Sequence, residues 1–281
     1  VLSQSKDIKN KIRAQKNRMF SPEVVDGFLT ASSRDSFWFD AVYMPLDALI
    51  RENNLNKGIN ITLEDLLSFA WIFHILIDFR SRFTATHSCG VAGVAVELAR
   101  CLGFSKDELK LMEIAGYLHD LGKIAIPVEV LEKPDKLTEE EFNLMRYHVY
   151  YTYRILENIE GLETINIWGA FHHERLDGSG YPFGLKAEDL PLGSRIMQVA
   201  DVFTALTEDR PYRKGLNPHD ALTHIKNLVK ENKLDKDVFS LLEANVDLIM
   251  EKLFDIRRKG LEKFDNFYSD MEVKTYAINV E

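Results

Sequence analysis

Apolar residues recur every three or four positions along most of this 281-residue chain, which is the spacing of one face of an α-helix. A faint strand-like alternation is confined to residues 273–280. The pattern therefore predicts an all-α protein. The predicted helices cover residues 63–77, 91–102, 109–119, 142–156, 165–173, 195–206 and much of 218–259.

Local signals mark where several of these helices begin and end. Ser21 before Pro22 predicts an N-cap followed by proline at the first helical position. Gly103 is expected to end the helix that contains residues 91–102. Three further pairs have the three-residue spacing of residues that close a first helical turn, namely Thr62 with Asp65, Ser105 with Glu108, and Thr138 with Glu141.

The patterns divide the chain into four expected parts. Residues 1–20 are interpreted as a linker helix, because residues 1–18 hold six Lys or Arg and one Asp without a strong apolar face. Residues 21–76 are expected to form an N-terminal helical layer, and residues 77–260 the main helical domain. Residues 261–281 form a tail with no informative motif.

Composition narrows the class of protein. Hydrophobic residues make up 46% of the chain, and the net charge of -9 disfavours general binding to nucleic acid, so no DNA binding is expected. Cys89 and Cys101 fall on one predicted helix at a separation of roughly 18 Å, beyond the reach of a disulfide. Reduced thiols and the lack of a membrane-length apolar run indicate a cytoplasmic domain. The start at Val1 leads us to expect a domain excised from a longer sensor protein.

The candidate chemistry centres on His119-Asp120, at the end of an apolar stripe. An imidazole and a carboxylate offer nitrogen and oxygen ligands, and the two carboxylate oxygens can bridge two cations. Five of the eight histidines stand in such apolar or motif-like contexts, whereas His74, His219 and His224 do not. The remaining candidate ligands are His87, His148, His172, His173 and Asp201.

The helical period predicts which way some of these side chains face. His87 lies four residues before Val91 and therefore on the buried face of its helix. Adjacent His172 and His173 point about 100° apart, so both serve one metal only near a helix end. Lys123 follows Asp120 by three residues, where it either contacts a phosphate or partners the carbonyl end of a helix.

These residues resemble the HD-GYP subgroup of the HD phosphohydrolase superfamily over about residues 77–230. The matching elements are residues 119–123, His148, residues 170–182 and residues 200–202. The resemblance implies an all-α helical core and makes residues 77–260 a phosphodiesterase domain. It further implies hydrolysis of cyclic dinucleotides, above all cyclic di-GMP to pGpG and GMP, by a hydroxide that bridges two iron or manganese ions.

The resemblance also assigns roles to residues of this chain. One metal would be held by His87, His119, Asp120 and Asp201, and Asp120 would bridge to a second metal held by His148, His172 and His173. Asp120 and Lys123 take catalytic roles. Contacts with the substrate are implied for Lys123, Gly180, Tyr181, Pro182, Arg210 and Arg213.

Departures from the family pattern and other functions are weighed as well. Phe83 stands where some members carry a Glu for a third metal, so two metals are expected. Val149, Thr152 and Thr204 replace a common Pro, Gly and Asp. The alternatives are an enzyme that prefers cyclic GMP-AMP, a non-catalytic receptor or scaffold for a cyclic dinucleotide, and a hydrolase of nucleoside phosphates, which the 180–182 segment disfavours. A diguanylate cyclase or other signalling partner and a homodimer are left open.

Overall fold

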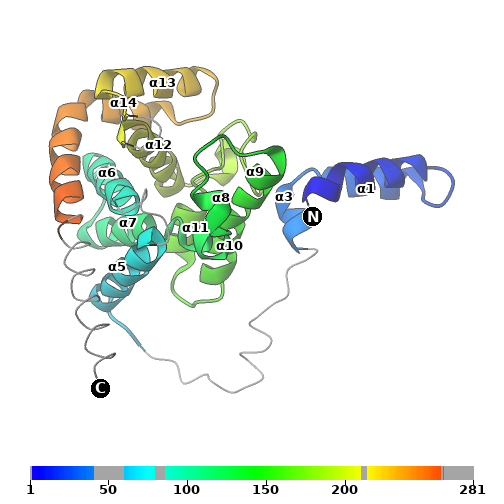
Figure 1. Cartoon of the computed structure of the whole chain (residues 1–281), viewed down its shortest axis with the longest axis horizontal. Helices are drawn as coiled ribbons and strands as arrows, with labels where there is room; N and C mark the ends of the chain where they lie inside the picture. Colours follow the sequence, from blue (N-terminus) through cyan, green and yellow to red (C-terminus); the bar gives the residue numbers. More distant parts are fainter. Residues whose placement is uncertain (1, 41–59, 80–85, 210–213, 261, 263–281) are drawn as a thin grey trace.

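The computed structural model describes residues 2–40, 60–79, 86–209, 214–260 and 262 (Figure 1). Across these residues the regular elements are helices, and strand pairing is limited to two isolated β-bridges. The all-α prediction is confirmed. The predicted alternation over 273–280 lies outside the described residues.

The helices follow one another through short turns. In the first half of the chain they are α1 (Leu2–Ala14), α2 (Pro22–Ala31), α3 (Asp35–Asp40), α5 (Leu63–Phe79), α6 (His87–Cys101), α7 (Lys106–Leu118) and η1 (Leu121–Ala125). The second half contains α8 (Val128–Leu131), α9 (Glu139–Met145), α10 (Tyr147–Leu156), α11 (Glu163–Ala170), η2 (Ala187–Asp189), α12 (Leu192–Thr207), α13 (Pro218–Lys230) and α14 (Lys236–Ala244). Residues 246–260 form a last helix.

The core is built around α6, which packs against α7 on one side and α12 on another (Figure 1). Val91, Val94 and Leu98 of α6 are fully buried there, as their helical spacing predicts. The close crossing of α6 and α7 requires Gly116, because a Cβ at that position would lie 2.5 Å from the Cα of Ala92. This crossing sets the depth at which the end of α7 enters the protein.

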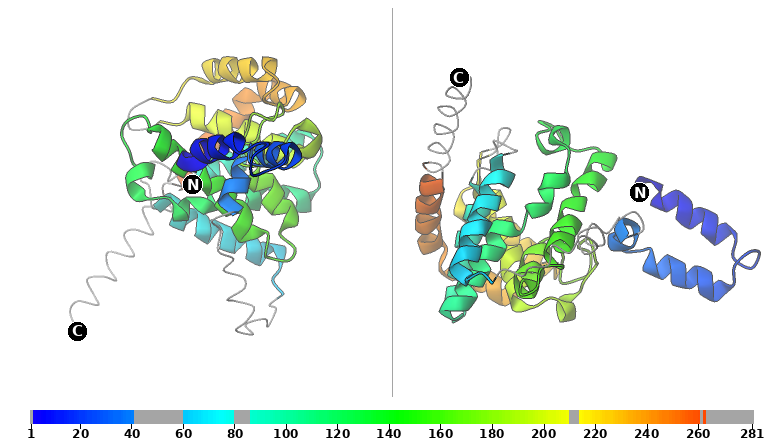
Figure 2. Two further views of the ribbon diagram at one scale, coloured as in Figure 1. Left: turned by 90° about the vertical axis from the view of Figure 1, so that its right-hand side faces the viewer. Right: turned by 90° about the horizontal axis from the view of Figure 1, so that it is seen from below.

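A second, smaller apolar cluster joins the first helices to α10. Leu2, Trp38, Phe39 and Tyr150 form its buried centre. Figure 2 shows α1 and α2 side by side, projecting away from the main body, with α3 at their base. By contrast, α5 packs against α7 and belongs to the main core. The domain boundaries that we expect remain a prediction.

The predicted capping signals are confirmed. Ser21 caps α2, with Pro22 in its first turn. The pairs Ser105–Glu108 and Thr138–Glu141 form reciprocal capping boxes, and Thr62 and Asp65 exchange hydrogen bonds. Gly103 follows the end of α6 with a φ of 80°, the left-handed conformation that glycine tolerates.

Two predicted helices differ from the observed ones. The stripe over 142–156 is divided, because α9 ends at Met145 and α10 begins at Tyr147. As a consequence, Phe142 is 46% exposed instead of buried. The helix expected over 165–173 ends at Ala170, so His172 and His173 lie in the turn that follows.

The cysteines and the membrane prediction agree with the structure. Cys89 and Cys101 both lie on α6 and are free thiols. None of the helices in the described part of the chain has the length and apolar character needed to span a bilayer.

Candidate metal centre

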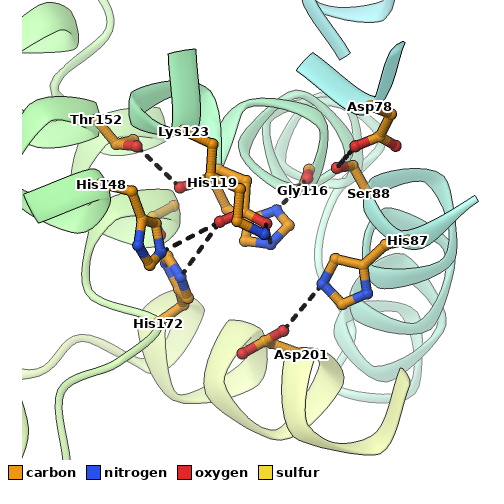
Figure 3. A network of polar contacts seen from close by, with 12 residues as sticks. Asp78, His87, Ser88, Gly116, His119, Lys123, His148, Thr152, His172 and Asp201 are labelled. Carbon is orange, nitrogen blue, oxygen red and sulfur yellow. Dashed lines mark hydrogen bonds and ion pairs between the residues drawn. The ribbon is translucent and has the colours of Figure 1, made fainter. Parts of the chain in front are cut away.

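The His119-Asp120 pair occupies the sharp turn between α7 and η1. Gly122 allows η1 to press against α10, since a Cβ at this position would lie 1.9 Å from the carbonyl oxygen of His148. Thr152 of α10 ties the turn from the other side. Its hydroxyl accepts a hydrogen bond from the Gly122 amide at 2.9 Å and donates one to the His119 carbonyl at 3.1 Å (Figure 3).

The other predicted ligands reach this turn from four separate segments. His87 is the first residue of α6, His148 lies on α10, and Asp201 lies in the middle of α12. The structure brings all seven predicted ligands together in overlapping groups whose ligand atoms lie within 4.8 Å of one another. These groups are His87, His119 and Asp201; His119, Asp120 and His172; and His148, His172 and His173.

Asp120 lies between the groups, and its two oxygens face different histidines. Its Oδ2 is 3.2 Å from Nε2 of His119, whereas its Oδ1 is 3.3 Å from Nε2 of His148 and 3.9 Å from Nε2 of His172 (Figure 3). A carboxylate in this position can offer one oxygen to each of two cations. The geometry is that of a bridging ligand.

Three of the histidines are oriented by their own backbone. The Nδ1 atoms of His119, His148 and His172 hydrogen-bond to carbonyl oxygens three residues earlier, at 2.7, 2.6 and 2.8 Å. This contact directs each Nε2 into the site, as in the outer shell of known metal centres.

The ring nitrogens left over provide a test of whether a metal fits. Among the described residues, Nε2 of His119 and Nε2 of His148 are buried without a hydrogen-bond partner. Each is within 3.3 Å of an Asp120 oxygen but lacks hydrogen-bond geometry. Buried polar atoms are rarely left unsatisfied, and a cation between the imidazoles and the carboxylate would satisfy them. The donor set therefore fits metal ions.

Charge and burial prepare several of these groups for ligation. Burial lowers the pKa of His148 to about 4 and that of His172 to about 3, so both imidazoles are neutral at pH 7. Burial opposes ionisation of Asp120, but His119 and Lys123 hold its pKa well below the usual range. Neutral imidazoles and an ionised carboxylate are the forms that bind a metal.

His87 is paired with two carboxylates. Its Nε2 lies 3.3 Å from Oδ1 of Asp201, and its Nδ1 lies 3.1 Å from Oε2 of Glu208. Burial would lower the pKa of His87, but these two carboxylates raise it to about 10. Glu208 is also held by the Thr86 hydroxyl, which donates to it at 3.0 Å.

Sequence reasoning missed Glu208. Its position seven residues after Asp201 corresponds to two helical turns, which places both carboxylates on one side of α12. That spacing is the signal that could have identified it.

Lys123 and the arginines have different outcomes. Lys123 contacts Asp120 Oδ2 at 2.5 Å, and although burial lowers the pKa of the lysine, Asp120 raises it overall. The contact of Lys123 with substrate stays a prediction. Arg210, Arg213 and Phe83 lie outside the described residues.

The Gly180-Tyr181-Pro182 segment is held beside His173. The Tyr181 amide donates to the His173 carbonyl at 3.2 Å, and the two rings are 5.0 Å apart. Gly180 permits this close course, because a Cβ there would lie 2.4 Å from the backbone of Glu174. The Tyr181–Pro182 peptide bond is cis.

Glu174 is a second residue that sequence reasoning missed. Its buried carboxylate accepts hydrogen bonds from the amides of Phe183 at 2.7 Å and Leu185 at 2.9 Å. It therefore determines the path of the loop. A carboxylate next to two histidines was itself a signal, because it stands between ligands and a glycine-rich turn.

Comparison with known proteins agrees with the fold and the motifs. Residues 72–238 match the family described as HD domain, and the chain therefore belongs to that family. The run from His172 to Pro182 places it in the HD-GYP group of the family.

Two curated relatives illustrate the match. The 3′3′-cGAMP-specific phosphodiesterase 1 of Vibrio cholerae is 33% identical over 231 residues, which cover 81% of this chain and 53% of the relative. The cyclic di-GMP phosphodiesterase response regulator RpfG of Xanthomonas campestris is 42% identical over 151 residues, covering 53% of this chain and 40% of the relative. The chain thus spans about half or less of the length of these relatives.

Solved structures share the fold. A cyclic GMP-AMP specific phosphodiesterase of Vibrio cholerae aligns with a TM-score of 0.50 and 26% identity, over 86% of this chain and 56% of that one. An HD-GYP-type protein from Bdellovibrio bacteriovorus aligns with a TM-score of 0.51 and 17% identity, over 66% of this chain and 65% of that one. The second likeness concerns the fold alone.

Proposed function

We propose that this protein is a metal-dependent phosphodiesterase that hydrolyses a cyclic dinucleotide. The observation that carries the proposal is the position of Asp120 between two groups of buried imidazoles, with Nε2 of His119 and of His148 lacking hydrogen-bond partners in the described part of the chain. A structural core has no need for such a concentration of unsatisfied donors and acceptors. The names of the curated relatives supply the substrate class.

Two divalent metals, iron or manganese, are the proposed cofactors. His87, His119 and Asp201 would hold one of them, and His148, His172 and His173 the other, with Asp120 shared. Bound there, the pair would supply a Lewis acid and a nucleophile at neutral pH for attack on a phosphodiester.

The residues of the chain position these partners and the substrate. Glu208 orients His87 through its Nδ1, and Thr152 keeps the His119-Asp120 turn in place. Lys123 lies beside Asp120 with its charge retained, so it can neutralise a phosphate that approaches the same carboxylate. Arg210, Arg213 and the 180–182 segment are proposed to contact the rest of the dinucleotide.

Cyclic di-GMP is the first candidate substrate, with pGpG and then GMP as products. Cyclic GMP-AMP is a second candidate, favoured by the relative that is named as specific for that nucleotide and covers 81% of this chain. A diguanylate cyclase or other signalling partner and a homodimer also remain predictions.

The test is chromatographic analysis of both nucleotides after incubation with manganese- or iron-loaded protein. Asp120→Asn removes the shared carboxylate charge while keeping the shape of the side chain, and we expect it to lose turnover and metal. His148→Ala is matched by His224→Ala, an exposed histidine on α13, which we expect to keep both.

The outcomes separate the functions. Cleavage by the native protein and not by Asp120→Asn supports the hydrolase and ranks the two substrates. Tight binding without cleavage, with two metals demonstrably bound, would favour a non-catalytic receptor or scaffold. Metal content clearly below two per chain after anaerobic loading would contradict the two-metal proposal.

A further inference from the structure

A chain of contacts connects helix α3 with Tyr181 of the loop beside the candidate metal centre. Asp35, the first residue of α3, forms an ion pair with Arg146. The guanidinium of Arg146 in turn lies over the Tyr181 ring, 4.6 Å from its centroid. Since α3 precedes the region that matches the HD domain family, these contacts link an upstream segment to the site.

Arg146 is well placed for this role. It occupies the junction between α9 and α10, two residues before the candidate ligand His148. Its guanidinium also lies 6.0 Å from the Phe142 ring, which meets the Tyr181 ring edge-on at 6.3 Å. Tyr181 therefore has Arg146 and Phe142 as neighbours in addition to His173.

A second contact fixes α3 to the same loop. The Ser36 amide donates a hydrogen bond to the Pro182 carbonyl at 3.0 Å. Backbone pairing of this kind holds the residue that follows Tyr181 at a defined distance from α3. The loop is thus anchored to α3 by one backbone contact and, through Arg146, by one charged contact.

The ion pair is shielded from water, which makes its loss consequential. The side chains of Asp35 and Arg146 are 15% and 24% exposed. Removal of a carboxylate from such a pair leaves the guanidinium partly buried without a counter-ion. The arginine would then turn toward solvent and away from the face of Tyr181.

We propose that Arg146 is a positioning residue that holds Tyr181 toward the substrate, and that Asp35 of α3 keeps Arg146 in place. Movement of the upstream helices would thereby change substrate affinity through Tyr181 without altering the metal ligands. The link to affinity rests on the proposed function, because it requires Tyr181 to contact the dinucleotide. The link between α3 and the loop does not.

The chain provides a matched control. Asp40 is the last residue of α3 and pairs with Arg154 of α10, while the Tyr150 hydroxyl donates to it at 2.5 Å. This second Asp–Arg pair joins α3 to the main body without contacting Arg146 or Tyr181. Asp40→Asn therefore weakens the docking of α3 without removing the counter-ion of Arg146.

The experiment compares hydrogen exchange of the loop amides in the full chain. The reporting amides are those of Tyr181, Phe183 and Leu185, each of which donates a hydrogen bond. In Asp35→Asn and Arg146→Gln we expect these amides to exchange on the order of fivefold faster than in the native protein. In Asp40→Asn the loop should exchange at the native rate, while α3 exchanges faster.

Arg146→Lys tests the stacking separately and guards against misfolding of the Gln variant. Lysine keeps the charge that pairs with Asp35 but lacks the planar face that covers an aromatic ring. Its loop amides should exchange at a rate between those of the native protein and Arg146→Gln.

Steady-state kinetics then tests the consequence for substrate. We expect Asp35→Asn to raise KM for the cyclic dinucleotide by roughly tenfold with kcat nearly unchanged, since the residue acts on binding alone. Metal content should stay at the native value. A general structural defect would lower kcat and metal content together.

Two results would overturn the inference. One is equal acceleration of loop exchange in Asp35→Asn and Asp40→Asn, which would make the effect a consequence of α3 docking in general. The other is native exchange in both Asp35→Asn and Arg146→Gln. If the native protein neither binds nor cleaves a cyclic dinucleotide, the proposed function fails, whereas the exchange rates still decide whether α3 controls the loop.

Discussion

The hydroxyl of Thr152 is predicted to stabilise the turn that carries His119 and Asp120. Thr152 is fully buried, and Thr152→Val replaces the hydroxyl by a methyl group of similar size. The Gly122 amide would lose its acceptor at 2.9 Å, and the His119 carbonyl would lose a donor at 3.1 Å. Both groups lie where water does not replace the lost contact.

The magnitude follows from the cost of unsatisfied buried groups. A buried donor left without its partner costs about 1–3 kcal/mol, and the carbonyl adds a smaller amount. We therefore expect Thr152→Val to lower the free energy of unfolding by about 2–4 kcal/mol, a large share of the roughly 5–15 kcal/mol of a typical protein. Metal affinity should fall as well, since the turn holds two candidate ligands.

The assay is urea unfolding of the metal-free protein, followed by measurement of metal affinity. Thr152→Ser keeps the hydroxyl and loses one buried methyl group, which costs about 1 kcal/mol. Thr223→Val removes an exposed helical hydroxyl that donates to the His219 carbonyl, and it should change stability by less than about 0.5 kcal/mol. If Thr152→Val is as stable as Thr152→Ser, the hydroxyl does not hold the turn and the reasoning is wrong.

Three further predictions concern the same part of the molecule. Gly122→Ala should cost about 4 kcal/mol or more in chemical unfolding, because its Cβ would overlap the His148 carbonyl; near-native stability would show that η1 can shift. Glu208→Gln should weaken metal binding by about 10- to 100-fold in a chelator competition, since His87 loses a charged partner; unchanged affinity would make that contact incidental. Ser105→Ala should lower the free energy of unfolding by about 1 kcal/mol through loss of the α7 cap, with metal content as the property that stays constant.

The candidate ligands could be predicted because each stands in a local pattern that determines its direction. His87 follows from the stripe of its own helix, and the observed burial of that side chain agrees with the prediction. The capping boxes at Ser105 and Thr138 depend on residues only three positions apart, so the sequence is sufficient to predict them.

The features that escaped prediction depend on contacts between distant segments. The apolar stripe continues past Arg146, so its period alone does not reveal that the helix is interrupted there. The partner of Arg146 is Asp35, which lies far upstream and has no local feature that distinguishes it from other acidic residues. The role of Thr152 likewise requires the distance between α10 and the η1 turn, which only the packed structure provides.

The helix ends at the candidate metal centre have a consequence for the order of binding. His119 is the C-terminal cap of α7, and His172 follows the end of α11, so two helices direct their carbonyl ends toward the site. These ends carry partial negative charge, to which the carboxylates of Asp120 and Asp201 add. The empty pocket would attract cations and repel a phosphodiester. Metal loading is therefore expected to precede nucleotide binding, with the metals reversing the sign of the field that the substrate meets.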